Sequence, residues 1–341
     1  MLLLALETSC DETSAAVIRD GAVLGAVVAS QIQLHAEYGG VVPELAAREH
    51  LRNLLPVTRT AVREAGVRFD ELDAIAATRG PGLPTALLVG FRAGQALAFI
   101  RRKPFVGIHH HEAHLYSPWI VGNPPQAQFD QLEPNVSLIV SGGHTLLVHV
   151  ESELKHRILG GTLDDAAGEC FDKTGKLMGL PYPAGPVIDR LAASGNSRAF
   201  NFPRPLLHDD NDDFSFSGLK TSVRYFLRDR PGLLEDAAAL RDLCASVQSA
   251  IVEVLVKKTI QAATRLGVKC VTASGGVTCN QHLRTELSRA CAKHQLRLRL
   301  AEKSLCTDNA AMVGILAERK LLHAPGSFTL DEDILPGWQL T

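Results

Sequence analysis

Apolar runs and polar turns alternate along the chain in a pattern that occurs twice. The N-terminus reads LLLALE, then a polar turn, TSCDETS, and then a second apolar stretch, AAVIRDGAVLGAVVAS. A strand, a turn and a strand form a β-hairpin, and each apolar stretch is expected to be one strand. Residues 136–150 repeat this pattern as VSLIV, SGGHT and LLVHV. The repetition predicts an internal duplication.

Strand and helix patterns alternate around these two hairpins, which indicates α/β layers. Between the hairpins we expect a helix over 44–66, a strand over 71–80, a helix after Thr85 and a strand over 104–108. After the second hairpin we expect a loop-rich insertion (160–218), long helices (231–266), a strand (269–276), a helix (280–294) and a final helix after TDN.

This order predicts two lobes. We expect the N-terminal lobe to span 1–120 and the C-terminal lobe 121–307, with the final helix of 308–341 packing back onto the first lobe. The stretch 121–135 is rich in Pro, Asn and Gln and is expected to connect the lobes. A ligand is expected in an interlobe cleft.

Composition favours a soluble, cytoplasmic protein. Hydrophobic residues make up 46% and charged residues 21%. The most apolar stretch, TALLVGFRAGQALAFI, is interrupted by Arg92 and is shorter than the roughly 20 apolar residues that a membrane span needs. The N-terminus has no basic segment typical of a secretory signal. The seven cysteines form no CxxC motif, so neither a thiolate zinc site nor a disulfide framework is predicted.

The net charge of -2 gives no general attraction to nucleic acid, so RNA would have to bind a local patch or a partner protein. Candidate patches are RRK at 101–103 and the basic residues between 284 and 299, although a solvated helix face explains each of them as well. The latter residues are Arg284, Arg289, Lys293, Arg297 and Arg299.

Two glycine pairs could bind a phosphate through backbone amides. Gly142 and Gly143 lie between two strands, and Gly275 and Gly276 lie between a strand and a helix. A tight hairpin and a helix capped by Asn280 are the alternatives. Two such turns in a duplicated frame suggest the actin, chaperone and sugar-kinase architecture, a duplicated RNase H-like fold.

The insertion is rich in acidic residues, which suggests a functional loop. Asp172, Gly185 and Asp189 could hold the hydroxyls of a ribose, because a carboxylate accepts both protons of a vicinal diol. Asp164 and Asp165 are expected to cap a helix.

The segment HHHEAH contains a histidine pair with the spacing of metal ligands. His110 and His114 are four residues apart, so on a helix they share one face. The segment does not fit HExxH, because His114 arrives one position too early after His111 and Glu112. Asp308 is either a third ligand or the N-cap of the final helix.

Long motifs in order along the chain resemble those of the tRNA N6-adenosine threonylcarbamoyltransferases, once described as O-sialoglycoprotein endopeptidases. The resemblance runs from about residue 3 to about residue 335. The motifs are ETSCDET, HAEYGGVVPELAAREH, GPGLPTALLVG, HHHEAH, VSGGHT, DDAAGECFDKTGKLMGLPYPAGP, FSFSGLKT, SGGVTCN and CTDNAAM.

This resemblance implies transfer of threonylcarbamoyl from threonylcarbamoyl-AMP to N6 of the adenosine beside the anticodon in tRNAs that read ANN codons. It implies a divalent metal ion, Fe(II) or alternatively Zn, bound by His110, His114 and Asp308. The residues that it assigns to the adenylate are Ile139, Val140, Ser141, Gly142, Gly143, Asp172, Gly185, Asp189 and Asn280. The implied partners are tRNA, a paralogous accessory protein of the same fold and a small ATPase.

The reaction needs a base for the amine proton, and Asp11 or Glu12 in the first polar turn is the candidate, with Asp11 favoured. Three other functions fit parts of the pattern: an ATP-dependent phosphotransferase for a small acceptor, a metal-dependent endopeptidase and a nucleotide-switched binding module. The histidine pair with Asp308 argues against the binding module, which would need no such pair.

Overall fold

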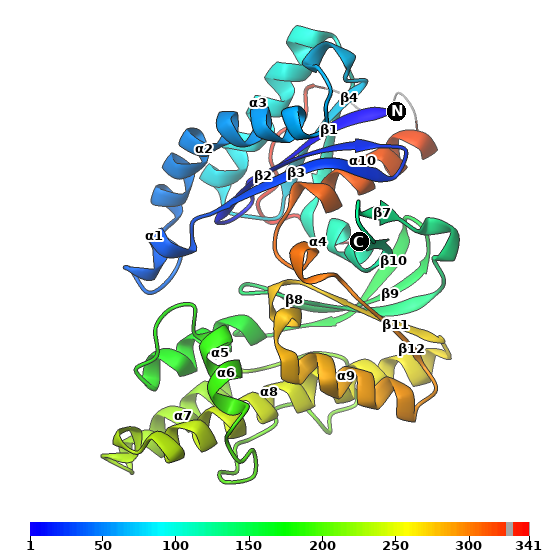
Figure 1. Cartoon of the computed structure of the whole chain (residues 1–341). Coiled ribbons are helices and arrows are strands. Elements are labelled where there is room, and N and C mark those ends of the chain that lie inside the picture. Colours follow the sequence, from blue (N-terminus) through cyan, green and yellow to red (C-terminus); the bar gives the residue numbers. More distant parts are fainter. Residues whose placement is uncertain (325–329, 341) are drawn as a thin grey trace. The chain divides into compact units, whose positions relative to one another are not determined.

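The computed structural model describes residues 1–324 and 330–340. The chain forms two compact units, one made of residues 1–132 and 307–341 and the other of residues 133–306. Each unit contains one β-sheet with helices packed on it (Figure 1).

The first unit is built on a seven-stranded sheet with the order β5-β4-β1-β2-β3-β7-β6. The strands are β1 (Leu2–Glu7), β2 (Glu12–Arg19), β3 (Ala22–Ser30), β4 (Ala74–Gly80), β5 (Phe105–His109), β6 (Ile120–Val121) and β7 (Gln126–Ala127). The helices are α1 (Ile32–Ala36), α2 (Pro43–Glu64), α3 (Pro84–Arg101), α4 (His110–Tyr116) and α10 (Ala310–His323).

Helices cover both faces of this sheet. Leu4 and Leu6 of β1 pack with residues of α2 and α3, whereas Ala5 faces Gly314 of α10 (Figure 1). All six residues of β1 are buried, which explains why LLLALE reads as a continuous apolar run. At Gly314 an added Cβ would lie 2.5 Å from Ile18 of β2, so glycine permits the close approach of α10.

The second unit has a five-stranded sheet with the order β10-β9-β8-β11-β12. Its strands are β8 (Asn135–Val140), β9 (Thr145–Ser152), β10 (Lys155–Gly161), β11 (Cys270–Ser274) and β12 (Arg297–Leu300). Its helices are α5 (Ala167–Leu177), α6 (Ala184–Ala192), α7 (Ser217–Arg228), α8 (Ala237–Leu266) and α9 (Gln281–Lys293). The 30-residue helix α8 contacts α6, α9 and the sheet and forms much of the core of this unit.

The predicted duplication is confirmed by strand order and direction. Each unit contains a meander of three antiparallel strands, β1-β2-β3 in the first and β8-β9-β10 in the second. In each unit the first strand of the meander also pairs with a parallel strand, which in turn pairs with a second parallel strand. The parallel strands are β4 and β5 in one unit and β11 and β12 in the other.

Three details differ from the expectations. The stretch after the first turn forms two strands, because the chain reverses at Asp20 and Gly21, which both have positive φ. The stretch 121–135 is not a bare connection, since β7 pairs with β3 and the first unit extends to Leu132. The insertion 160–218 is also less loop-rich than expected, because it contains α5 and α6.

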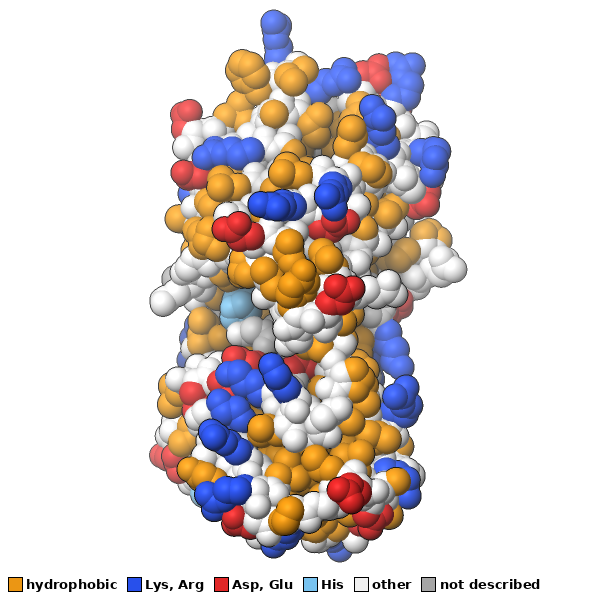
Figure 2. All heavy atoms as spheres, turned by 90° about the vertical axis from the view of Figure 1, so that its left-hand side faces the viewer, with side chains coloured by type: hydrophobic (Ala, Val, Ile, Leu, Met, Phe, Trp, Pro, Cys, Tyr) orange, Lys and Arg blue, Asp and Glu red, His pale blue; other side chains and the backbone are white. Residues whose placement is uncertain are grey.

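The surface has no single dominant charge. On the face shown in Figure 2, Lys and Arg side chains are interspersed with acidic and apolar ones. This mixture agrees with a net charge of -2. No helix within the described residues is both long and apolar enough to cross a membrane.

Candidate metal centre and active site

The two candidate histidines lie on α4, which begins directly after β5. The Nδ1 atom of His109 accepts a hydrogen bond from the backbone N of Glu112 at 3.3 Å and so caps the helix. His110 and His114 are both buried and lie one helical turn apart, with ring centroids separated by 4.8 Å. The predicted helical placement of this pair is confirmed.

Asp308 is close to both histidines. Its Oδ1 atom lies 3.2 Å from Nε2 of His110 and 3.2 Å from Nε2 of His114. The adjacent Asn309 caps α10 by accepting a hydrogen bond from the backbone N of Met312 at 3.0 Å. Because Asn309 provides the cap, the carboxylate of Asp308 is directed to the imidazoles.

Two imidazole nitrogens and one carboxylate oxygen therefore converge, all within 4.8 Å of one another. This donor set fits Fe(II) or Zn and leaves coordination positions open. The buried Nδ1 of His114 has no hydrogen-bond partner among the residues that the structure describes. All three residues belong to the first unit.

The charges of this group suit the binding of a cation. Burial lowers the pKa of His110, but Asp308 and Glu7 more than offset this, so that its pKa is well above the ordinary value. Burial raises the pKa of Asp308, but His110 and His114 lower it by more, so that the pKa lies well below the ordinary value. For His114 burial dominates and the pKa is lowered. Two carboxylates thus lie against the ring of His110, and their negative charge favours a cation at this place.

Glu7 is a side chain beside the ligand group that the sequence patterns did not single out. Its Oε2 atom lies 3.0 Å from Nδ1 of His110, on the side of the ring away from Nε2. Glu7 is fully buried at the end of an otherwise apolar strand. A lone acid in such a strand is the signal that could have identified it.

Glu112, the acidic residue of the HHHEAH segment, forms an ion pair with a lysine of α10. Its Oε2 atom accepts a hydrogen bond from Nζ of Lys320 on α10 at 2.6 Å. The Glu112 side chain is 8% exposed. Glu112 thus joins α4 to α10, and an endopeptidase gains no support from this geometry.

The turn that contains Asp11 and Glu12 lies near the ligand group. Glu12 is buried, and burial together with Asp11 and Asp308 raises its pKa well above the ordinary value. Asp11 is half-buried. The hydroxyl of Ser9, in the same turn, lies 3.3 Å from Nδ1 of His110, so the turn lies beside the ligand group.

The residues that the resemblance assigns to the adenylate all belong to the second unit. Ile139 and Val140 end β8, and Ser141 closes the turn by donating its backbone N–H to the carbonyl of His144 at 2.8 Å. A Cβ added to Gly142 or Gly143 would meet nothing within 4 Å.

The second glycine turn lies against the first. Gly275 has a φ of +91°, and an added Cβ would lie 2.3 Å from the carbonyl oxygen of Val140. Glycine is needed at position 275 because of the positive φ and because a side chain would collide with Val140. Asn280 caps α9 by accepting a hydrogen bond from the backbone N of Leu283 at 2.9 Å, as the structural alternative predicts.

The two candidate aspartates contact backbone amides. Asp172 Oδ1 accepts from the backbone N of Ala184 at 2.8 Å and from that of Gly185 at 3.4 Å. Asp189 Oδ2 accepts from the backbone N of Gln281 at 2.9 Å. In each case these hydrogen bonds use a single carboxylate oxygen. The other oxygen makes no further hydrogen bond within the described part of the chain and can accept one from a ligand.

The expected caps in the insertion are partly confirmed. Asp164 accepts hydrogen bonds from the backbone N atoms of Phe216 and Ser217, where α7 begins. Asp165 instead forms ion pairs with Lys173 and Lys220.

The candidate basic patches differ in how far they are neutralised. Arg289 pairs with Glu286, and Arg297 pairs with Glu133. Arg284 donates to the carbonyls of Thr278 and Ala301. These contacts favour the interpretation that the basic residues between 284 and 299 belong to ordinary helix and strand surfaces rather than to an RNA-binding patch.

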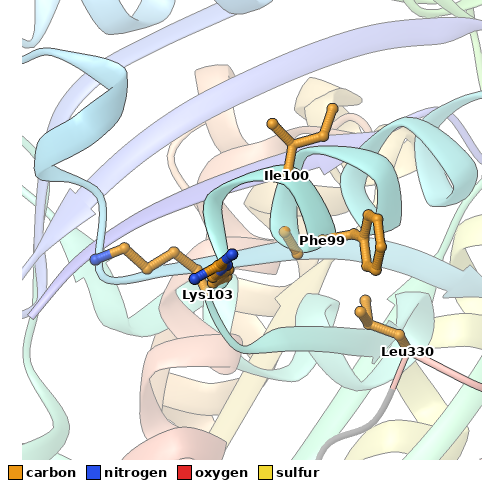
Figure 3. Close-up of a pocket in the computed structure, with 6 residues that line it drawn as sticks. Phe99, Ile100, Lys103 and Leu330 are labelled. Atoms are coloured by element: carbon orange, nitrogen blue, oxygen red, sulfur yellow. The ribbon is translucent and has the colours of Figure 1, made fainter.

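The RRK segment is next to a pocket of about 510 Å³ (Figure 3). Its lining residues are Ala98, Phe99, Ile100, Arg102, Lys103 and Leu330. It lies at the end of α3, just before β5 begins, whereas His110 and His114 follow the other end of β5. The pocket is therefore separate from the candidate metal centre.

Comparisons with known proteins agree with the geometry. A family model described as tRNA N6-adenosine threonylcarbamoyltransferase matches residues 22–315. The relative with that description in Acidovorax sp. (strain JS42) is 47% identical over 348 residues, which cover 99% of this chain and 97% of the relative. The relative with the same description in Syntrophotalea carbinolica is 50% identical over 335 residues, which cover 98% of this chain and 95% of the relative.

Two solved structures support the predicted fold class. Full-length HypF in its phosphate- and nucleotide-bound form matches with a TM-score of 0.60 at 13% identity, covering 96% of this chain and 47% of HypF. The activator of 2-hydroxyisocaproyl-CoA dehydratase from Clostridium difficile with bound ADPNP matches with a TM-score of 0.51 at 11% identity, covering 95% and 97%. These likenesses concern the fold alone.

The resemblance first seen in the motifs is thus confirmed over nearly the whole length, and this chain belongs to the tRNA N6-adenosine threonylcarbamoyltransferase family.

Proposed function

We propose that this transferase moves the threonylcarbamoyl group from threonylcarbamoyl-AMP to N6 of the adenosine beside the anticodon in tRNAs that read ANN codons, and that its transfer depends on a metal centre. The observation that carries the proposal is the convergence of His110, His114 and Asp308 within a chain of this family. A nucleotide-switched binding module would have no use for such a buried ligand group.

In this proposal Nε2 of His110, Nε2 of His114 and Oδ1 of Asp308 hold a divalent ion, Fe(II) by family and Zn as the alternative. The bound ion supplies stabilisation of negative charge on phosphate or acyl oxygens of the substrate. The protein holds the three ligand atoms in fixed orientations, because all three side chains are at least four-fifths buried.

The second unit binds the adenylate in this proposal. Gly142 and Gly143 offer backbone amides that donate no hydrogen bond within the described part of the chain, so they can orient a phosphate. Asp172 and Asp189 accept ribose hydroxyls through the oxygens that their backbone contacts leave available. Asn280, next to the second glycine turn, contacts the adenosine; Gly185, beside Asp172, leaves space for it.

Asp11 removes the proton. An exocyclic adenine amine is a poor nucleophile, because its lone pair is delocalised into the ring. As the new N–C bond forms, Asp11 accepts the amine proton, and the bond from the acyl carbon to the phosphate oxygen breaks with its electron pair leaving on AMP. Asp11 is half-buried in the turn whose Ser9 hydroxyl lies 3.3 Å from Nδ1 of His110, which supports this assignment.

The enzyme is expected to act on tRNA in the cytoplasm together with a paralogous accessory protein of the same fold and a small ATPase. The outer face of α2 is the candidate surface for the paralogue. Leu51 and Leu55 lie one turn apart on this face and are 69% and 55% exposed.

The direct test replaces one ligand. His110→Ala is expected to abolish threonylcarbamoyladenosine formation in a reconstituted assay with tRNA, while circular dichroism shows a folded chain. His149→Ala, which removes a histidine of β9 outside the ligand group, is the control and is expected to retain transfer. Wild-type activity of His110→Ala would refute the proposed role of the metal centre.

A further inference from the structure

Glu7 has all the contacts that a buried carboxylate needs. Its side chain is completely buried at the end of β1, where an ionised group is destabilising unless its oxygens accept hydrogen bonds. One oxygen, Oε1, accepts from the backbone N of Ser9. The other, Oε2, accepts from the hydroxyl of Thr78 at 2.5 Å and lies 3.0 Å from Nδ1 of His110. Glu7 is thus held rigidly against one ring nitrogen.

The contact determines which nitrogen of His110 carries a proton. An imidazole that donates its Nδ1–H to a carboxylate has its remaining lone pair on Nε2. In this chain Nε2 is the atom that lies 3.2 Å from Asp308. The side chain of Ser9 is also 3.3 Å from Nδ1. His114 has no equivalent partner on its Nδ1 within the described residues, so a carboxylate fixes the proton position of His110 but not that of His114.

We infer that Glu7 is a positioning residue of the metal centre, which holds His110 with Nδ1 protonated and Nε2 directed at the ion. This inference rests on the proposed function. A carboxylate that accepts from the second nitrogen of a ligating histidine fixes the ring and raises the basicity of the ligand. Thr78 and Ser9 in turn fix Glu7, so the supporting shell extends from the start of the first turn to β4.

Glu7→Gln tests the inference with little change of shape. Both oxygens of Glu7 only accept hydrogen bonds, from Ser9 on one side and from Thr78 and His110 on the other. A carboxamide has a single acceptor oxygen. In either orientation its NH₂ group therefore faces a hydrogen-bond donor, with which it cannot form a hydrogen bond. The matched control is Glu318→Gln, because Glu318 is a buried glutamate of the same unit that accepts from the backbone N atoms of Asp20 and Gly21.

The measurement is the affinity of the full-length chain for Zn(II), by competition with a chromophoric chelator, together with the absorption spectrum of bound Co(II). We expect Glu7→Gln to bind Zn(II) about 10- to 100-fold more weakly than wild type, with the same stoichiometry and an altered Co(II) spectrum. Glu318→Gln is expected to stay within about twofold of wild type, because it lies outside the supporting shell.

Glu7→Asp keeps the charge but withdraws the carboxylate from Nδ1 and serves if Glu7→Gln fails to fold. It is expected to weaken Zn(II) binding as well. Wild-type affinity in the folded Glu7 variants would overturn the inference while leaving the metal centre intact. A wild-type chain that binds no Zn(II) or Co(II) would overturn the proposed metal centre and this inference with it.

Discussion

Asp11 is the residue on which the chemistry of proton removal depends in the proposed mechanism. Asp11→Asn keeps the size of the side chain but cannot accept a proton at neutral pH. We expect kcat for transfer to fall about 10²- to 10⁴-fold, the usual contribution of a general base, because the amine proton has no acceptor. Single-turnover formation of threonylcarbamoyladenosine measures this.

The metal content of Asp11→Asn is the control for that experiment, because Asp11 is not one of the three ligands. Metal content is expected to equal that of wild type. If Asp11→Asn transferred at the wild-type rate with its metal bound, Asp11 would not be the base.

The sequence allowed the candidate ligand group to be predicted, but not its surroundings. The spacing of His110 and His114 is enough to place both on one helical face, because the period of a helix is fixed. Asp308 and Asn309 are both good cap residues, and the choice between them depends on tertiary contacts. Glu7 contacts His110 across 103 positions of sequence, and no local pattern encodes such a contact.

Among the helices, α4 and α10 are joined by the ion pair of Glu112 and Lys320. Glu112→Ala leaves the Lys320 ammonium without its partner, in a place where its side chain is only 23% exposed. We expect a loss of about 2 kcal/mol in the free energy of unfolding, less than for a fully buried pair because water still reaches the lysine. Urea unfolding of the metal-free protein measures this.

The double variant Glu112→Leu with Lys320→Met removes both charges and is the control. It is expected to recover most of the lost stability, because no unpaired charge is left. A Glu112→Ala variant as stable as wild type would show that the pair contributes nothing.

In the second unit, Asp164 stabilises the beginning of α7. Burial opposes ionisation, but hydrogen bonds from Ser215, Phe216 and Ser217 together outweigh it and lower the pKa of Asp164 from 3.8 to about 2. A carboxylate with a lowered pKa in the folded state stabilises the fold at any pH above its unfolded value. Because Asp164 is exposed, we expect Asp164→Ala to cost only about 1 kcal/mol at pH 7, the usual worth of a helix cap.

The difference in stability between wild type and Asp164→Ala is expected to narrow as the pH falls from 4 towards 2, because the carboxylate protonates in both states. Thermal unfolding at several pH values measures it. Asp209→Ala, at another exposed aspartate of the insertion, is the control for the loss of a surface carboxylate. A difference that stays constant down to pH 2 would contradict this account of Asp164.

Element boundaries were predicted where the local pattern is strong and missed where turns are brief. The residues Asp20 and Gly21 form a turn within an apolar stretch, and a dipeptide of this type is itself a hairpin signal. The helices α5 and α6 were hidden by Gly and Pro around them, although α6 begins directly after a proline. Their stability comes from tertiary packing, because α6 packs against α8, α5 packs against α7, and the two helices pack against each other.

At the scale of the whole molecule, the metal should stabilise one unit rather than the entire chain, because all three ligands are in the first unit. Binding at a concentration 100 times the Kd stabilises the native state by about 2.7 kcal/mol. We expect added Zn(II) to slow hydrogen exchange in β1, α4 and α10. Peptides from 133–306 are the internal control. Equal protection in both units would contradict this localisation.

The repeated strand pattern was enough to predict the doubled α/β architecture, because both hairpins and the helices between them have strong periodicity. The boundary between the units was not predictable to the same accuracy. The pairing of β7 with β3 joins residues about 100 positions apart, and the two-residue strands β6 and β7 are too short to leave a pattern.

The most direct test measures metal content and transfer on the same samples. Purified enzyme is analysed by elemental mass spectrometry and assayed for threonylcarbamoyladenosine in tRNA, before chelation, after chelation and after the metal is returned. We predict about one ion per chain, and transfer that falls and recovers in proportion to it. Transfer at the full rate by a chain that has lost its metal would contradict the central claim that His110, His114 and Asp308 form a centre on which the reaction depends.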